Sequence, residues 1–217
     1  MTNNIQYKPD NLQENKIDYI IKKIKHIKNI QILELGVNKG ISTKKFLKLC
    51  ELNNGFLTSI DIDDCSTVAK SDKWNFIHSS DDNFEFIDKA IKEKVDFLFI
   101  DSFHEPNHVE KVFYHYYDFL KEDGICIIDD ISWLPYTKNE FRDNSSNEYT
   151  NRKTFQKILE ISNQNKDKFT MEFLFEASGL AIITKKKNFL NKAKKIPSRE
   201  FSFKSLLRKI LKVTPKK

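Results

Sequence analysis

The stretch from 95 to 130 constrains the fold of this chain more than any other. It contains two apolar runs: the first ends at Asp101, and the second ends at the pair Asp129 and Asp130. An amphipathic segment lies between them, so the pattern predicts two buried strands joined by a helix. In open parallel sheets, ligands bind beyond the carboxyl ends of the strands. We therefore expect the three carboxylates to lie close together, beyond the carboxyl ends of the strands.

Patterns elsewhere extend this unit into a doubly wound α/β fold. Apolar runs predict further strands at 30–35, 56–61 and 74–78, and two more on either side of Ser178 and Gly179. Isoleucines at helical spacing from 17 to 27 and the segments 82–92 and 155–161 predict helices. The first fourteen residues lack periodicity and are expected to form a flexible arm.

The positive charge of the chain is concentrated at its end. The net charge is +6, but ten Lys and Arg against the single acid Glu200 give residues 188–217 a charge of +9, which leaves −3 on residues 1–187. We therefore expect one domain over 1–187 and a basic tail over 188–217. Because nucleic-acid enzymes usually carry positive charge at the site itself, no nucleic-acid partner is expected.

The tail has the pattern of an amphipathic helix. Phe203, Leu206, Leu207, Ile210 and Leu211 share a face, and basic residues occupy the others. Such a helix is suited to an anionic membrane surface, so 201–212 is expected to make peripheral membrane contact. Docking on the same domain or on a second subunit of a homo-oligomer is an equal alternative.

The three cysteines, Cys50, Cys65 and Cys126, lack metal-ligand spacing and are odd in number. The chain has no apolar run approaching the roughly 20 residues that span a bilayer, and its N-terminus is polar. The expected location is the cytoplasm. Peripheral attachment of the protein to the inner surface of the membrane is a further expectation.

A cofactor site is indicated where the first expected strand turns into a helix. Glu34 lies in that strand, Gly36 and Gly40 follow it, and Ser42 or Thr43 is the candidate helix cap. About 21 residues after Gly40, Asp61 ends the next strand, where dinucleotide folds place an acid that binds a ribose. The glycine spacing is not the GxGxxG of pyrophosphate-binding loops, so a nucleoside-type ligand is favoured.

These residues together resemble class I S-adenosylmethionine-dependent methyltransferases. The resemblance covers about 30–185 and implies a Rossmann-like, seven-stranded, mostly parallel sheet with an antiparallel last strand. S-adenosylmethionine is the implied cofactor, and it would contact the glycine loop and Asp61, with Ser79, Ser80 or Asp81 at the adenine. Asp101, His104 and the pair Asp129 and Asp130 are similar to the pattern of metal-dependent sugar O-methyltransferases of the macrocin and mycinamicin type, and of the family of cephalosporin-hydroxylase-like proteins.

The acids at the two strand ends are candidate metal ligands. Asp101, Asp129 and Asp130 could merely cap the following helices, but three acids exceed what capping requires, and their mutual repulsion favours a bound cation. Oxygen ligands indicate Mg²⁺ or a similar hard ion. His104 is the candidate base, although a loop histidine is as often a solvated side chain.

The acceptor is expected at the loop 131–152, where Trp133 and Tyr136 offer flat surfaces for a sugar or an aromatic group. The predicted reaction is methyl transfer to a hydroxyl of a sugar or other vicinal diol bound to Mg²⁺, for example in bacterial polysaccharide or natural-product glycan synthesis. Two alternatives stay open: a noncatalytic or hydroxylase-like member of the fold, and, less favoured, a nucleic-acid methyltransferase.

Overall fold

The fold is built on one mixed sheet of seven strands. In the computed structural model, which describes residues 9–91, 93–140, 142–197 and 202–210, the strand order is β3-β2-β1-β4-β5-β7-β6. The strands from β3 to β5 pair in parallel, and β7 is antiparallel to both β5 and β6, which confirms the predicted topology. Their bounds are β1 Gln31–Leu35, β2 Phe56–Asp61, β3 Trp74–His78, β4 Val95–Ile100, β5 Leu120–Asp129, β6 Phe169–Leu174 and β7 Leu180–Lys185.

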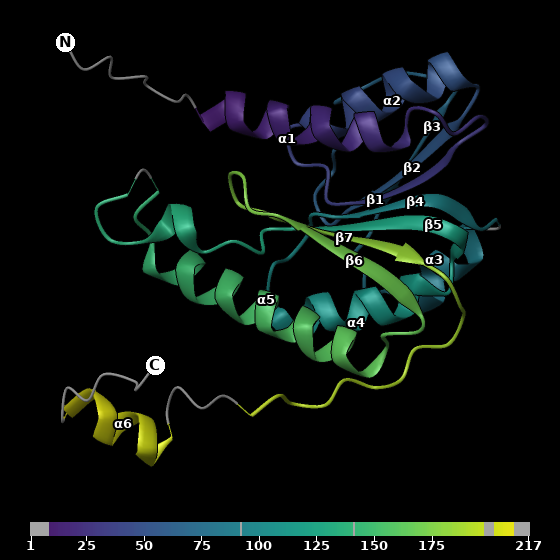
Figure 1. Cartoon of the computed structure of the whole chain (residues 1–217). Coiled ribbons are helices and arrows are strands. Elements are labelled where there is room, and N and C mark those ends of the chain that lie inside the picture. The colour runs from purple at the N-terminus through teal and green to yellow at the C-terminus, as the bar shows by residue number, and fades with distance from the viewer. Residues whose placement is uncertain (1–8, 92, 141, 198–201, 211–217) are drawn as a thin grey trace, which may run out of the picture.

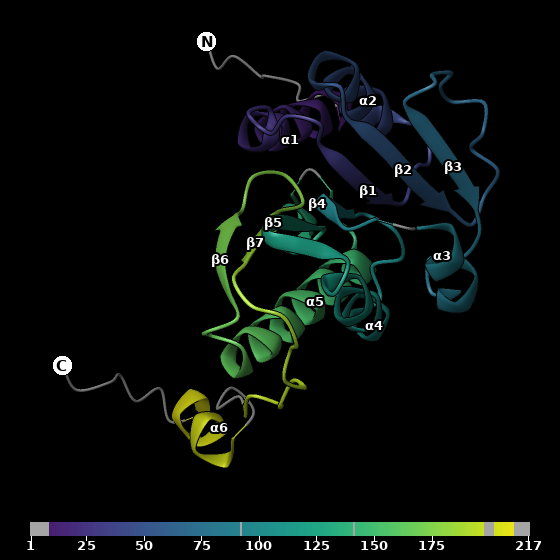
Figure 2. The ribbon, with the colours of Figure 1, turned by 90° about the vertical axis from the view of Figure 1, so that its right-hand side faces the viewer.

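Helices cover both faces of this sheet (Figures 1 and 2). The helices α1 and α2 lie on one face, while α4 and α5 lie on the other. Their bounds are α1 Pro9–Ile24, α2 Ile41–Asn53, α3 Phe84–Ala90, α4 Pro106–Tyr117, the short 3₁₀ helix η1 Leu134–Tyr136, α5 Ser145–Gln164 and α6 Phe203–Ile210.

The central strands are apolar on both faces because both are covered. In β4, Phe97 and Phe99 pack on the side of α1 and α2, where both rings contact Phe46 edge to face. Leu98 and Ile100 point to the opposite side and join the core beneath α4 and α5. Alternate residues of one strand thus belong to two cores, as the period of two requires.

The aromatic side chains of α4 pack against the sheet. Phe113, Tyr116 and Tyr117 are fully buried in the core between the helix and the sheet. The Tyr116 hydroxyl donates to the carbonyl of Asp81, and the Tyr117 hydroxyl donates to the carbonyl of Lys168. These bonds satisfy the polar ends of rings that are otherwise buried among apolar groups.

Three helix starts differ from the sequence prediction. The helix α1 begins at Pro9, within the stretch expected to be an arm, and α5 begins at Ser145, within the expected long loop. The first turns of α5 are polar and show no apolar periodicity, but the Asn144 side chain caps them by accepting from two backbone amides. The N-cap of α2 is Gly40 in the left-handed conformation, with φ of 72°, and not Ser42 or Thr43.

The C-terminal helix α6 lies away from the sheet (Figure 1). Its four apolar side chains are all exposed: Phe203, Leu206, Leu207 and Ile210. Within the described residues, no helix is long and apolar enough to cross a bilayer. The ends of the predicted tail segment 201–212 lie outside the described residues.

Candidate active site

A cleft of about 1010 Å³ opens at the carboxyl ends of the parallel strands, where the sequence places the candidate residues. A volume of this size accommodates a nucleoside together with a small acceptor. Its wall includes most of the predicted site residues and also side chains from α1 and from the loops after β5 and β6. The predicted residues in the wall are Gly36, Ser42, Asp61, Ser80, Asp81, Asp101, His104, Asp130 and Tyr136.

The carboxylate of Asp61 fixes the loop between β1 and α2. Its Oδ2 accepts hydrogen bonds from the backbone amides of Val37, at 2.7 Å, and Asn38, at 3.0 Å, and its Oδ1 accepts from the amide of Asp63. Although partial burial works in the opposite direction, these backbone bonds lower the pKa of Asp61. The predicted ribose contact would therefore be made by a charged carboxylate that already holds the glycine loop.

Gly36 brings the cofactor loop against the end of β4. Its φ is +94°, and a Cβ atom at this position would lie 2.2 Å from the backbone oxygen of Asp101. Only glycine tolerates both conditions. The close approach links the predicted cofactor loop directly to the loop that carries the predicted acid and base.

Glu34 lies behind the cleft and is not part of its wall. Its carboxylate is fully buried and accepts hydrogen bonds from the hydroxyls of Ser42, at 2.6 Å, Thr43, at 2.9 Å, and Ser59, at 2.6 Å. Burial raises the pKa of Glu34 to about 7 in spite of these bonds. The carboxylate predicted to bind the cofactor therefore holds the start of α2 against β1 and β2, and a contact with the amine of the cofactor stays a prediction.

Asp81 occupies the predicted adenine side of the cleft with partners of its own. Ser102 donates to Asp81 Oδ2 at 2.5 Å, and His108 Nε2 lies 2.9 Å from Asp81 Oδ1. This contact raises the pKa of the His108 imidazole. Ser80 donates to Asp82 at 2.6 Å. Because Asp82, Ser102 and His108 also line the cleft, Ser80 and Asp81 are both held by other residues of the cleft wall.

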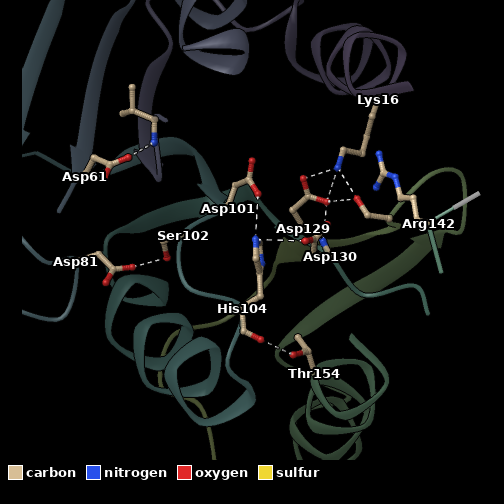
Figure 3. Close-up of polar contacts among 12 residues, drawn as sticks. Lys16, Asp61, Asp81, Asp101, Ser102, His104, Asp129, Asp130, Arg142 and Thr154 are labelled. Atoms are coloured by element: carbon tan, nitrogen blue, oxygen red, sulfur yellow. Dashed lines mark hydrogen bonds and ion pairs between the residues drawn. The ribbon is translucent and has the colours of Figure 1, made fainter. Parts of the chain in front are cut away.

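The ends of β4 and β5 bring their acids together around His104 (Figure 3). His104 Nε2 lies 3.3 Å from Asp130 Oδ2 and 3.6 Å from Asp101 Oδ1. The Thr154 hydroxyl of α5 donates to the His104 carbonyl and thereby holds this loop. Burial, and the nearby charge of Asp129, raise the pKa of Asp101 well above its usual range.

Helix capping does not explain why Asp101 and Asp130 occur at these strand ends. The helix α4, which follows Asp101, is capped by the Glu105 side chain and begins with Pro106. Asp130 has a left-handed backbone conformation, with φ of 55°, that residues other than glycine rarely adopt. Strained backbone of this kind is more common at functional sites.

The buried side chain of Lys16, from α1, reaches the same cluster (Figure 3). Lys16 Nζ donates to Asp129 at 2.6 Å for Oδ1 and 2.5 Å for Oδ2, and to the Ser178 hydroxyl at 2.8 Å. Desolvation disfavours the charged ammonium, but Asp129, Asp101 and Asp130 together raise the pKa of Lys16. Lys16 and Ser178 both belong to the cleft wall.

Residues 33–131 match the family model described as a methyltransferase domain. These residues run from within β1 to just after β5 and include Asp61, His104 and Asp130. This part of the chain is therefore similar to methyltransferase domains. No curated protein matches its sequence.

Solved structures share the fold of this chain at low sequence identity. A putative caffeoyl-CoA O-methyltransferase from Staphylococcus aureus has a TM-score of 0.62 and 20% identity, over 80% of this chain and 83% of that one. MycE from the mycinamycin biosynthetic pathway, in complex with Mg and SAH, has a TM-score of 0.59 and 17% identity, over 88% of this chain and 58% of that one. SAH-bound PaMTH1 from Podospora anserina has a TM-score of 0.60 and 13% identity, over 81% and 78%. The chain thus has the Rossmann-like fold of class I S-adenosylmethionine-dependent methyltransferases.

The two aromatic residues predicted to bind the acceptor have different surroundings in the structure. Tyr136 lies in the cleft wall, where the guanidinium of Arg142 donates to its hydroxyl at 3.2 Å. Trp133 is not part of that wall; its ring packs against Phe155, with 5.4 Å between centroids, and under Arg152. The geometry brings Tyr136 to the site and places Trp133 in the packing of α5.

Several side chains of the cleft were not found from the sequence. Lys16 is one of several lysines in α1, and no spacing rule links it to Asp129, 113 residues later. Arg142 lies in a segment without periodicity, and Ser178 was treated only as part of a hairpin connection. His108 carried one signal, because it lies one turn after the candidate base, but a helical histidine is usually a solvated side chain.

Proposed function

We propose that this chain is a methyltransferase. It transfers the methyl group of S-adenosylmethionine to a hydroxyl oxygen of a small acceptor with vicinal hydroxyls, such as a sugar. The observation that carries the proposal is the position of His104. Its imidazole lies between Asp101 and Asp130, in the same cleft as Gly36 and Asp61, so a base adjoins the predicted cofactor loop. An oxygen acceptor has a proton to lose, and His104 supplies a group to take it.

The reaction needs alignment and one proton transfer. The acceptor oxygen attacks the methyl carbon, the bond from carbon to sulfur breaks, and S-adenosylhomocysteine leaves. The hydroxyl proton passes to His104 Nε2, where the nearby carboxylate of Asp130, 3.3 Å away, stabilises the imidazolium. Because the methyl group of the cofactor is already activated, binding both reactants in line supplies most of the remaining rate acceleration.

The Mg²⁺ that the sequence predicts would need free oxygen ligands from Asp101, Asp129 and Asp130. Both oxygens of Asp129 bind the Lys16 ammonium instead, and Oδ1 also accepts from the amide of Asp130. Among the described residues, no three His, Cys, Asp or Glu side chains are arranged to hold a metal ion. The three-acid set therefore does not fit a metal as it is placed, and the proposal uses no metal step.

His104→Gln tests the proposal directly. With labelled S-adenosylmethionine and a panel of sugars and catechols, the wild-type protein should transfer the methyl group to oxygen, and the variant should lose about 10²–10⁴-fold in rate. S-adenosylhomocysteine should bind both proteins equally, measured by calorimetry. His115→Gln is the matched control, because His115 pairs with Asp88 and lies outside the cleft wall.

The alternatives give different results in the same assay. Absence of transfer to any acceptor, with intact cofactor binding, would favour the noncatalytic or hydroxylase-like reading. Transfer to nucleic acid alone would favour the nucleic-acid alternative, against which the acidic cleft argues. Unchanged transfer by His104→Gln would contradict the role of this side chain while leaving the reaction itself in place.

A further inference from the structure

The carboxylate cluster of the site already contains a cation supplied by the chain. The Lys16 side chain is 3% exposed, and its ammonium has three oxygen partners within 2.8 Å: both oxygens of Asp129 and the hydroxyl of Ser178. An ammonium has three protons to donate, so this set satisfies all of its donors. Lys16 is a fully paired buried ion and not a solvated lysine near an acidic patch.

The charge of Lys16 acts on the whole cluster. Figure 3 shows the Lys16 ammonium bonded to Asp129, with Asp101 and Asp130 gathered around His104 in the same cluster. Its positive charge lowers the repulsion that would otherwise arise where β4 and β5 end side by side. A bound divalent ion would fulfil the same electrostatic role, which was the reason to predict one from the sequence.

We propose that the Lys16 ammonium is the resident cation of this site and that methyl transfer by this chain does not depend on a divalent metal ion. The inference deepens the proposed function, because it concerns how the same site is charged. Lys16 lines the cleft that His104 also lines, so its positive charge stabilises negative charge that develops on the acceptor oxygen. A divalent ion at Asp129 would first have to displace a buried, fully bonded ammonium.

Two measurements on the purified protein and on Lys16→Met test this proposal. Met keeps the length of the side chain and removes its charge. Mn²⁺, as the metal probe, should show no binding through Asp129 in the wild-type protein by electron paramagnetic resonance. Lys16→Met should bind Mn²⁺ at least 10-fold more tightly, and the further change Asp129→Asn should abolish that gain. A merely structural lysine would not produce this gain of metal affinity.

Transfer assays provide the second measurement. The wild-type rate should be unchanged by EDTA or by added Mg²⁺, whereas Lys16→Met should be slower and should recover in part with Mg²⁺. Lys23→Met is the matched control: it removes another lysine of α1, one paired with Glu172 outside the cleft wall, and should resemble the wild type in both measurements. Lys16→Arg keeps the charge and should exclude Mn²⁺, so it tests the proposal even where Lys16→Met is unstable.

Failure of this inference is distinguishable from failure of the proposed function. Stoichiometric Mn²⁺ binding by the wild-type protein that Asp129→Asn removes, or transfer that EDTA abolishes, would overturn the resident cation while supporting the methyltransferase reaction. Exclusion of Mn²⁺ by the wild type and its binding by Lys16→Met, without transfer to any acceptor, would uphold the resident cation and contradict the proposed acceptor chemistry.

Discussion

Glu34 shows how a single buried carboxylate makes stability depend on pH. Its oxygens bind three hydroxyls, and burial raises its pKa from 4.5 to about 7. A carboxyl group with a raised folded-state pKa favours folding while both states are protonated. This advantage is lost as the pH rises from the unfolded value towards the folded one, because the unfolded chain ionises first.

Glu34→Gln should remove this dependence. In the wild-type protein, the free energy of unfolding attributable to this residue should fall between pH 4.5 and pH 7, by at most about 3 kcal/mol. Urea unfolding of both proteins across this range measures it, and Glu34→Gln should gain stability relative to the wild type as the pH rises. Glu85→Gln, at an exposed surface pair with Lys89, is the control and should show a constant difference. A constant difference for Glu34→Gln as well would contradict the buried charge.

Individual residues of the site were predictable from their place at strand ends, but their partners were not. Asp61, Asp101 and Asp130 reach the cleft because each ends or directly follows a parallel strand. Asp129 ends such a strand too, yet its carboxylate binds Lys16, which comes from a helix on one face of the sheet. Strand periodicity fixes where a side chain starts; it carries no information about which of several lysines in a helix will reach it.

At the scale of elements, α6 presents an apolar and basic surface away from the sheet. Phe203, Leu206, Leu207 and Ile210 are exposed, and Lys204 and Arg208 lie beside them. Each basic residue near an anionic bilayer contributes about 1 kcal/mol, and apolar side chains add to this where they enter the interface. This combination favours an anionic membrane surface as the partner of α6.

The full chain should therefore sediment with phosphatidylglycerol vesicles and not with phosphatidylcholine vesicles, and added salt should weaken the binding. The double change Phe203→Glu and Ile210→Glu should abolish it. Leu52→Glu, at an equally exposed apolar residue of α2, should not. Equal binding to both kinds of vesicle would contradict the electrostatic part of this prediction, whereas concentration-dependent self-association that the double change removes would identify α6 as a subunit contact instead.

The elements themselves were largely predictable because their apolar periods are strong. The strands of the parallel half and the hairpin of β6 and β7 lie where alternation or short apolar runs predicted them. The predicted starts of α1 and α5 were wrong because the first turns of both helices are mostly polar, and α5 begins at the Asn144 cap rather than at an apolar face. Local capping chemistry decided these boundaries, and the hydrophobic pattern did not record it.

For the whole molecule, the cleft joins two halves of the sheet. One wall comes from the end of β2 and from the loop after β1 that Asp61 holds, and the other comes from the loops after β4 and β5. A ligand that touches both walls should stabilise the entire fold, because it binds the folded chain alone.

S-adenosylhomocysteine at 100 times its dissociation constant should raise the free energy of unfolding by about 2.7 kcal/mol, and a thermal melt should shift upward by several degrees. His104→Gln should show the same shift, because this side chain is assigned to the acceptor and not to the cofactor. Adenine alone, at the same concentration, is the control and should shift the melt less. Absence of a shift with S-adenosylhomocysteine would contradict the placement of the cofactor in this cleft.

The contact between Lys16 and Ser178 limits which fragments of this protein can be expressed with the site unchanged. The match to the family model spans 33–131, yet Lys16 precedes that region and Ser178 follows it. A fragment trimmed to the matched boundaries would keep all three acids and lose the ammonium that neutralises them. Expression of such a fragment would thus yield a polypeptide with a different electrostatic centre, and its affinity for metal ions would say little about the intact enzyme.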